Sequence, residues 1–292
     1  MPLRTSRSRS PRAGLIGLVV PELTNPVFPV YVQVIEGMLV RANYTPVLGT
    51  QSPGGVQEDD YIQMMVDHGV AGIVFVSGLN ADTRSDPTRY RLLRDRGLPV
   101  VFLNGMVPGL DAPFVSCDDA ESAVLAVNHL VDLGHRRIGL ASGPERYVPV
   151  IRKRDGFLRA VRDRLGADGS DLVRCSVFSV EGGQAAGSDL LAAGATAIVC
   201  GSDLMALGVI RAARARGLSV PGDVSVVGYD DSPLVAFTDP PLSTVRQPVR
   251  EMGETAVRAL LEEIAGTGAT RGELLFRPEL VVRGSTGPAR PR

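Results

Sequence analysis

The stretch GLIGLVVPELTNPVF, Gly14 to Phe28, decides the fold of this 292-residue chain. It opens on a continuous apolar run without alternating polar positions, which is typical of a parallel strand covered on both faces. A proline, a short polar turn and a second proline follow, and a helix over 27–42 is predicted after them. The stretch therefore predicts a buried strand whose carboxyl end leads through a polar turn into a helix.

The same succession continues along the chain, where short apolar runs alternate with longer segments of helical period. The predicted strands are 15–20, 46–49, 72–76, 100–103, 114–117, 138–141, 173–178, 197–200 and 224–228. The predicted helices are 27–42, 57–67, 86–96, 119–133, 150–165, 182–193, 203–216 and 249–264. Strands that alternate with helices predict an α/β fold with parallel sheets covered by helices.

The C-terminal part departs from this alternation. The segment PPLSTVRQPV is bounded by prolines and reads as extended, and ELLFRPELVVRGST predicts one or two edge strands. The total of eleven or twelve strands favours two sheets of about six over one very wide sheet. The last residues, GPARPR, are predicted to be disordered.

Composition and charge exclude several classes of protein. The chain is 44% apolar and 22% charged with a formal net charge of −1, so it offers no general electrostatic attraction to nucleic acid or to a membrane surface. No apolar run reaches the length of a membrane span. Cys117, Cys175 and Cys200 are too far apart for a zinc pattern or a redox pair, so we expect small core residues in a reducing, cytoplasmic setting.

Signatures of enzymes are missing from the sequence. It has no glycine fingerprint for a dinucleotide, no phosphate loop ending in Gly-Lys-Ser/Thr and no Gly-x-Ser-x-Gly elbow. His68, His129 and His135 do not have the spacing of metal ligands on a helix. We therefore expect no catalytic residue, no metal and no cofactor.

Polar residues follow the carboxyl ends of several predicted strands. In open α/β sheets ligands bind at this edge, because loops diverge there and helix N-termini present unpaired N–H groups. Each position alone is also typical of a helix cap or a turn. Five equivalent positions together favour a ligand site: the turn 22–25 with Phe28, Asn104, the GPERY loop 143–147, Ser202 with Asp203, and Tyr229 with Asp230.

Several of these segments closely resemble the effector-binding core of the lactose/galactose repressor (LacI/GalR) family of bacterial transcription regulators. They are GLIGLVVPELTNPVF, VNHLVDLGHRRIGLASGP, CGSDLMALGVIRAARARGLSVPGDVSVVGYDD and PPLSTVRQPVREMGETAVRALL with ELVVRGST, and they occur in order from about residue 3 to 286. The resemblance implies two doubly wound parallel-sheet lobes of the periplasmic-binding-protein type. Three crossovers join such lobes, and a small effector lies between them.

Carried onto this chain, the resemblance predicts four parts. They are a basic linker remnant at 1–13, an N-terminal lobe at 14–117 plus 249–275, a C-terminal lobe at 118–248 plus 276–284, and a tail at 285–292. The family's helix-turn-helix domain and hinge helix precede this core, and LRTSRSR resembles the linker directly after them. Members of this family usually dimerise through the core, so the resemblance implies a homodimer. The first helix is a candidate for the dimer interface, and the alternative is that its apolar residues form an ordinary core stripe. Operator DNA is expected to bind only through a helix-turn-helix domain absent from this chain.

The resemblance also assigns site residues. Phe28 corresponds to an apolar wall residue, Asn104 to the polar residue after the fourth strand, Phe178 to an aromatic platform and Asp230 to the acid that accepts ligand donors. Two positions depart from the family, which often has Asn-Asp at Ser202-Asp203 and arginine at Lys153. The full predicted ligand-binding set is Asn25, Phe28, Asn104, Arg146, Tyr147, Arg152, Lys153, Phe178, Ser202, Asp203 and Asp230.

A polyol fits this set, because a carboxylate accepts hydroxyl hydrogens, basic groups donate to ring oxygens and aromatic side chains cover apolar faces. We therefore expect the small-molecule effector to be a carbohydrate, with a nucleoside-like ligand left open. The main alternative function is a solute-binding protein of a sugar import system, which shares the fold but carries an export signal or a lipid-anchored cysteine. An enzyme on the same two lobes is a third reading that lacks a catalytic couple.

Overall fold

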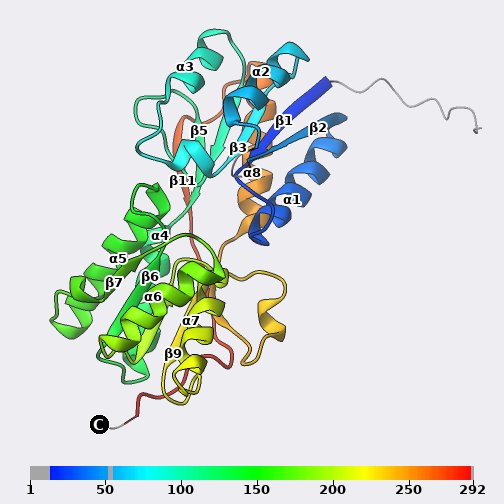
Figure 1. The fold of residues 1–292 in the computed structure, drawn as a ribbon. Helices are drawn as coiled ribbons and strands as arrows, with labels where there is room; N and C mark the ends of the chain where they lie inside the picture. The colour runs from blue at the N-terminus through cyan, green and yellow to red at the C-terminus, as the bar shows by residue number, and fades with distance from the viewer. Residues whose placement is uncertain (1–13, 52–54, 291–292) are drawn as a thin grey trace, which may run out of the picture.

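The computed structural model describes residues 14–51 and 55–290, so the predicted linker remnant at 1–13 lies outside the described residues. Two six-stranded sheets with flanking helices lie end to end (Figure 1). The first sheet holds β1 (Gly14–Val20), β2 (Tyr44–Thr50), β3 (Ile73–Val76), β4 (Val100–Leu103), β5 (Pro113–Cys117) and β11 (Gly272–Phe276). The second holds β6 (Ile138–Ser142), β7 (Val173–Cys175), β8 (Ala197–Cys200), β9 (Ser225–Asp230), β10 (Ser243–Arg246) and β12 (Glu279–Val281).

The first sheet has the order β11–β5–β4–β3–β1–β2 with every pair parallel, and the second has the order β12–β10–β9–β8–β6–β7 with β12 alone antiparallel to its neighbour. The predicted α/β fold with two doubly wound parallel sheets is confirmed.

Helices cover both faces of each sheet because each helix has an apolar stripe that it must bury. On the first sheet, α1 (Val27–Arg41) and α8 (Val249–Ala265) pack on one face, and α2 (Glu58–Asp67) and α3 (Thr88–Asp95) pack on the other. On the second sheet, α4 (Asp119–Asp132) and α5 (Val148–Leu165) lie opposite α6 (Val180–Ala192) and α7 (Asp203–Ala215). We call each sheet with its helices a lobe.

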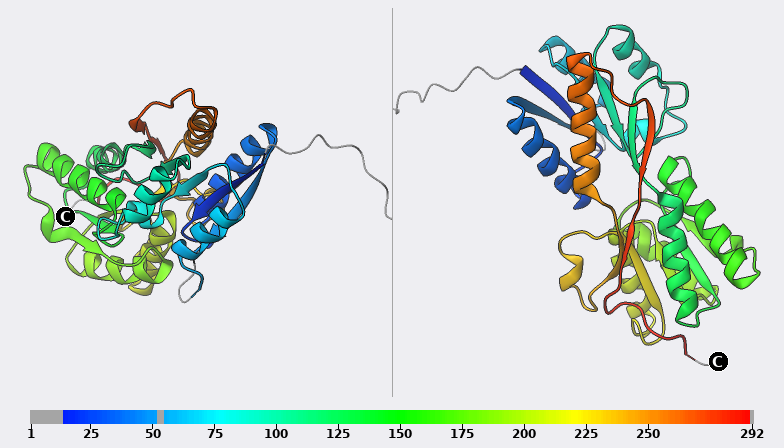
Figure 2. Two further views of the ribbon diagram at one scale, coloured as in Figure 1. Left: turned by 90° about the horizontal axis from the view of Figure 1, so that it is seen from above. Right: turned by 180° about the vertical axis from the view of Figure 1, so that it is seen from behind.

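The chain passes between the lobes three times. It crosses after β5, after β10, and between β11 and β12 (Figure 2). Two of these crossover segments are joined, since the Asp118 N–H donates to the Phe276 carbonyl at 2.8 Å. The crossovers agree with the predicted number, and the residue boundaries of the lobes remain our proposal.

Helix ends follow ordinary capping chemistry. Gly97, Gly134 and Gly217 have φ of 74°, 90° and 72°, the left-handed conformation that glycine adopts without steric cost where helices end. Asp118 caps α4, because its carboxylate accepts the Glu121 N–H at 3.0 Å. One face of α1, which includes Tyr31, is buried in the core, whereas its other apolar residues are half-buried or exposed.

Three local predictions need correction. The strand predicted over 173–178 ends at Cys175, and Phe178 lies in the turn before α6, where Ser179 caps the helix. The 3₁₀-helix η1 (Gly78–Ala81) is absent from the predicted elements, whereas the segment predicted to be extended does contain a strand, β10. Cys175 is exposed on the edge strand β7, whereas Cys117 and Cys200 are buried as expected.

Most of the C-terminal segment predicted to be disordered is instead held against the second lobe; residues 291–292 lie outside the described residues. Ser285 is fully buried, and the Ala289 N–H donates to the Leu133 carbonyl at 2.8 Å. The buried His135 ring has Nε2 3.1 Å from the Gly287 carbonyl oxygen and 2.9 Å from Ser225 Oγ. These contacts explain the order, because they satisfy backbone groups that a free tail would leave to water.

We expect the folded protein to lose stability in mild acid through His135. Burial lowers the pKa of this imidazole below its ordinary value of 6.5, so below pH 6.5 the unfolded chain binds a proton that the folded chain does not. Stability is therefore complete above about pH 6.5 and falls as the pH drops towards the folded-state pKa. Urea unfolding between pH 7.5 and 5 checks this, with a shallower pH dependence in His135→Gln than in a matched change at the exposed His68.

We also expect Gly156→Ala in α5 to destabilise the second lobe. A Cβ at Gly156 would lie 2.3 Å from the Ala120 carbonyl oxygen of α4, a backbone atom that cannot move aside cheaply. Overpacking of this kind costs about 1–3 kcal/mol. Gly37→Ala in α1 is the matched control, because a Cβ there meets only the far end of Arg41, and replacing helical glycine stabilises by about 1 kcal/mol. Equal melting temperatures for the two variants would contradict the close approach of α4 and α5.

Candidate effector cleft between the lobes

A cavity of about 700 Å³ lies between the two lobes, at the carboxyl ends of both sheets. Its walls come from the loops that follow β1, β2, β3 and β4 in the first lobe and β6, β7, β8 and β9 in the second, with Gln247 on a crossover. This volume is within the range of small-molecule sites in proteins. The loops that the sequence predicted to share one edge therefore line one common cavity.

Nine of the eleven residues predicted from the sequence line this cavity. They are Asn25, Phe28, Asn104, Arg146, Tyr147, Lys153, Phe178, Ser202 and Asp230. Two of them also serve the backbone: Asn25 Oδ1 accepts the Val27 N–H at the start of α1, and Ser202 Oγ accepts the Met205 N–H at the start of α7. The cap role and the site role are thus combined at these positions.

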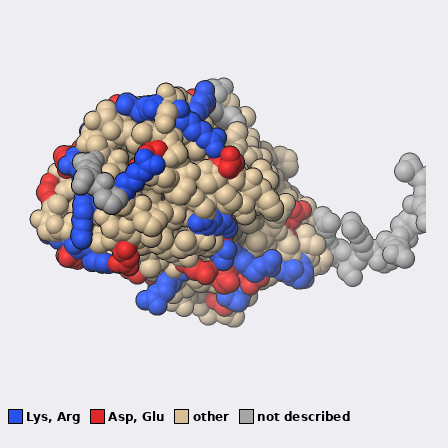
Figure 3. Space-filling view, turned by 90° about the horizontal axis from the view of Figure 1, so that it is seen from below, with Lys and Arg blue, Asp and Glu red and all other residues tan. Residues whose placement is uncertain are grey.

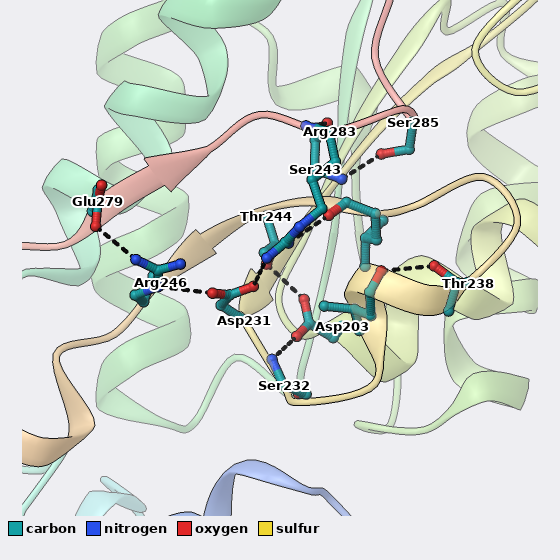
Figure 4. Close-up of polar contacts among 12 residues, drawn as sticks. Asp203, Asp231, Ser232, Thr238, Ser243, Thr244, Arg246, Glu279, Arg283 and Ser285 are labelled. Carbon is teal, nitrogen blue, oxygen red and sulfur yellow. Dashed lines mark hydrogen bonds and ion pairs between the residues drawn. The ribbon is translucent and has the colours of Figure 1, made fainter.

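Arg152 and Asp203 do not line the cavity, which corrects their predicted placement. Arg152 instead makes a two-pronged ion pair with Glu273 of β11, at 2.8 and 2.7 Å. Asp203 points beneath the site, where Thr244 Oγ1 donates to Oδ1 at 2.6 Å and the Ser232 N–H donates to Oδ2 at 2.7 Å (Figure 4). Both side chains are used to hold structure together.

Asp230 is the most unusual group in the cavity. Asp230 is 6% exposed, its Oδ1 accepts the Gln247 amide at 2.7 Å, and its Oδ2 has no hydrogen-bond partner in the described structure. Burial, followed by the nearby charge of Asp203, raises the pKa of Asp230 well above its ordinary value, and the side chains of Gln247, Lys153 and Asn25 oppose this shift. A buried acceptor without a partner is costly unless a ligand supplies a donor.

The backbone at Asp230 is strained, and this conformation sets the direction of the Asp230 carboxylate. Asp230 and the following Asp231 have φ of 117° and 57°, a region that non-glycine residues seldom occupy. Asp231 is held from two sides, since Arg246 Nε and Arg283 Nη2 lie 2.7 and 2.6 Å from its carboxylate oxygens (Figure 4). Such strain clusters at functional sites and persists only where surrounding contacts fix it.

A chain of polar contacts links Asp230 to the first lobe. Asn104, at a φ of 55°, donates from Nδ2 to the Tyr31 hydroxyl at 3.4 Å, and that hydroxyl donates to Gln247 Oε1 at 3.1 Å. Gln247 then donates to Asp230. The amide of Gln247 is therefore oriented by both lobes, and it fixes which oxygen of Asp230 remains open.

Lys153, in the same lobe as Asp230, is already neutralised within the protein. Its ammonium pairs with the Asp119 carboxylate, which also accepts the Tyr229 hydroxyl at 3.0 Å, and it lies 3.6 Å from the centre of the Tyr229 ring. Lysine and acid are both buried, so each satisfies the other in a water-poor environment. The remaining N–H groups of Lys153 can donate to a neutral ligand oxygen.

Aromatic side chains provide the apolar part of the wall. Phe178 packs directly over Gly143, where a Cβ would lie 2.1 Å from the ring, and its ring centre is 6.4 Å from that of Tyr147. Phe28 lines the cavity from α1 in the first lobe. The cavity therefore combines polar groups with flat apolar surfaces, the combination that binds sugar rings or bases.

Sequence reasoning missed Asp119, Gln247 and Ser77 as cavity residues. Each directly follows a strand or lies within two residues of its carboxyl end, so the rule used for the other candidates applies to them as well. Gln247 was missed because the segment that contains β10 was predicted to be extended without a stated end residue, and Asp119 was missed because Asp118 accounts for the cap of α4.

Two other kinds of site can be checked among the described residues. Among residues 14–51 and 55–290 there is no group of His, Cys, Asp and Glu arranged to hold a metal ion, and no helix there is long and apolar enough to cross a membrane. On the face of the second lobe in Figure 3, basic and acidic side chains are interspersed among larger uncharged areas. That face offers no concentrated positive charge to a nucleic acid.

Comparison with known proteins agrees with this geometry. The family model described as a periplasmic binding protein-like domain matches residues 127–286. The HTH-type transcriptional regulator MalR of Streptomyces coelicolor is 58% identical over 290 residues, which are 98% of this chain and 84% of MalR. The structure of the dimeric Lac repressor matches with a TM-score of 0.82 at 25% identity, over 94% of this chain and 100% of that one. The chain belongs to the LacI family of transcriptional regulators.

A further LacI-family likeness concerns the ligand. The complex of the transcriptional regulator CelR with cellobiose matches with a TM-score of 0.83 at 29% identity, over 94% of this chain and 86% of CelR. That protein is a regulator of the same fold with a disaccharide bound. The likeness confirms the fold and family expected from the sequence.

We expect Asp203→Leu to destabilise this LacI-family fold. Leucine has no acceptor, so the substitution leaves the Ser232 N–H and the Thr244 hydroxyl without the carboxylate oxygens to which they now donate. An unsatisfied buried group costs about 1–3 kcal/mol, measurable as a lower midpoint in urea. Asp163→Leu on α5 is the control for loss of one negative charge. If Asp203→Leu unfolds like the parent protein, the two hydrogen bonds of Asp203 do not support the loop of Asp230.

Proposed function

We propose that this chain is the effector-binding core of a LacI-type DNA-binding transcriptional regulator and that its effector is an uncharged carbohydrate. One observation carries the proposal: Asp230 lines the cavity, and its buried Oδ2 has no hydrogen-bond partner among the described residues. A sugar hydroxyl supplies such a donor, and a charge-assisted hydrogen bond of this kind contributes about 1.5–3 kcal/mol. The cellobiose bound by CelR supports the same ligand class.

The charges around the cavity favour a neutral ligand over a phosphorylated one. The two cations that line it are already paired, Lys153 with Asp119 and Arg146 with Asp82 at 2.8 Å. An anionic effector would have to displace one of these acids and would also face Asp230. A polyol instead uses the lysine as a donor and the aspartate as an acceptor without separating either ion pair.

The proposed mechanism is a shift between lobe arrangements. An effector that binds residues of both lobes favours the arrangement in which they face each other, and a homodimer converts that change into a new separation of its DNA-binding segments. The dimeric state of the Lac repressor supports the homodimer. Such a regulator acts in the cytoplasm, and the relatives named as transcriptional regulators favour this role over sugar import or enzyme catalysis.

We expect a disaccharide to raise the melting temperature of the protein. Ligand at a hundred times its dissociation constant stabilises the folded state by about 2.7 kcal/mol. A melting screen compares cellobiose, maltose, glucose, glucose 6-phosphate and adenosine, each at 10 mM (~10⁻² M, well above micromolar dissociation constants). Stabilisation by the phosphorylated sugar or the nucleoside alone would contradict the proposed ligand class.

Asp230→Asn is expected to abolish that shift while leaving the unliganded melting temperature unchanged or higher. The amide keeps an acceptor for Gln247 and removes a desolvated charge, so the fold loses nothing that Asp230 contributed. Asp239→Asn is the matched control, since the Asp239 side chain is 99% exposed. A full ligand response in Asp230→Asn would show that this carboxylate is only structural.

A further inference from the structure

Two contacts outside the crossovers join the lobes directly. At the edge of the cavity, the Asp82 carboxylate lies 2.8 Å from Arg146 Nε. Beside it, the Thr83 N–H and hydroxyl both donate to the Arg146 carbonyl, at 2.9 and 2.8 Å, and Asp82 pairs with Tyr147 as an isolated antiparallel bridge. Asp82 and Thr83 belong to the first lobe, whereas Arg146 and Tyr147 belong to the second.

The second contact is the Arg152–Glu273 ion pair. Arg152 lies in the second turn of α5 in the second lobe, and Glu273 lies in β11 of the first. Both ends of the guanidinium are engaged, and the side chains are 27% and 12% exposed. Burial raises the pKa of the Glu273 carboxyl, but the Arg152 hydrogen bonds, the Ser116 side chain and the Arg152 charge together outweigh it and lower that pKa, so the pair is ionic at neutral pH.

Both contacts involve the same segment of the second lobe. Residues 144–153 include Arg146 and Arg152, and the same segment supplies Tyr147, Pro149 and Lys153 to the cavity wall. A displacement of this segment relative to the first lobe would therefore open the cavity wall. The position of the segment is decided by first-lobe acids that are themselves absent from the cavity lining.

The loop of the first lobe that carries Asp82 is held in place by its neighbours. Asn80, in η1 directly before Asp82, donates from Nδ2 to the carbonyls of Leu103 and Gly105 at 3.3 and 3.2 Å. Gly105 lies so close to Ala81 that a Cβ would be 2.6 Å from its Cα. The loop is thus fixed to the end of β4, and Asp82 cannot follow Arg146 if the lobes part.

We propose that Asp82 and Glu273 are positioning residues of the cleft, forming a two-point ionic clamp with Arg146 and Arg152 that holds the 144–153 segment against the first lobe. The clamp fixes the population of the closed arrangement before any ligand binds. The apparent dissociation constant of the effector equals the intrinsic constant divided by the fraction of molecules in the closed arrangement. The clamp therefore sets effector sensitivity without contacting the effector. The role of the clamp in effector binding rests on the proposed function, whereas the clamp itself can be tested without a ligand.

The ligand-free test is amide hydrogen exchange of the Asp82→Asn/Glu273→Gln variant. The Thr83 amide hydrogen is bonded across the lobes, so we expect its exchange to accelerate about tenfold or more, and 0.5 M salt to accelerate it in the parent protein but not in the variant. The control variant Asp59→Asn/Asp132→Asn removes two ion pairs that stay within a lobe, Arg89–Asp59 and Arg164–Asp132. Equal exchange in the clamp variant, the control and the parent protein would overturn the proposal.

A charge reversal separates positioning from a merely structural role. Glu273→Arg is expected to open the contact, and Glu273→Arg with Arg152→Glu is expected to close it again and to restore slow exchange at Thr83. Failure of the reversal to restore protection, while both variants keep the parent melting temperature, would also overturn the proposal.

The effector arm uses calorimetric titration with cellobiose and maltose. We expect the clamp variant to bind the sugar that stabilises the parent protein about three- to thirtyfold more weakly, with the salt dependence of affinity lost. Unchanged affinity and unchanged salt dependence would contradict the clamp. If neither sugar binds the parent protein, the carbohydrate proposal fails, and the exchange experiment still decides the clamp.

Discussion

The structure depends on one constraint, which is that the carboxyl ends of two parallel sheets face each other across a gap. Parallel strands place all of their following loops and the N-termini of the following helices at one edge. Three crossovers lie at this edge and keep the two edges opposed. Every group of the cleft, from Asn25 after β1 to Asp230 at the end of β9, reaches the cavity because of this arrangement.

The cleft trades stability for binding at Asp230. A buried carboxylate with an open oxygen and a left-handed φ is unfavourable in the unliganded fold, and the surrounding structure bears that cost through Asp231, which is held by Arg246 and Arg283. Lys153 is arranged differently, since it is neutralised by Asp119 within the protein. The cavity therefore presents one carboxylate oxygen that lacks a donor and one ammonium that keeps N–H groups to give, which matches a ligand rich in hydroxyls.

Two kinds of connection between the lobes have different consequences. The crossovers are stretches of the chain itself, and the hydrogen bond from the Asp118 N–H to the Phe276 carbonyl joins two of them. They therefore allow the lobes to rotate but not to separate. The contacts of Asp82 and Glu273 are ionic, partly exposed and outside the crossovers, so salt and ligand can change their population. A regulator whose effector acts by lobe placement needs both, because a rigid connection alone would leave nothing for the effector to shift.

The sequence by itself determined the α/β fold, the number of sheets and strands and the strand ends that form the cleft, because apolar runs, helical period and capping residues are local signals. The sequence could not decide which of two candidate residues lines the cavity, as with the adjacent Arg152 and Lys153 or with Asp203 and Asp230. Lys153 faces the cavity while Arg152, one residue away on the same helix, faces Glu273 of the other lobe. Side-chain direction on a helix changes by a large angle with each residue, and only packing against the second sheet and the first lobe fixes which residue turns inward.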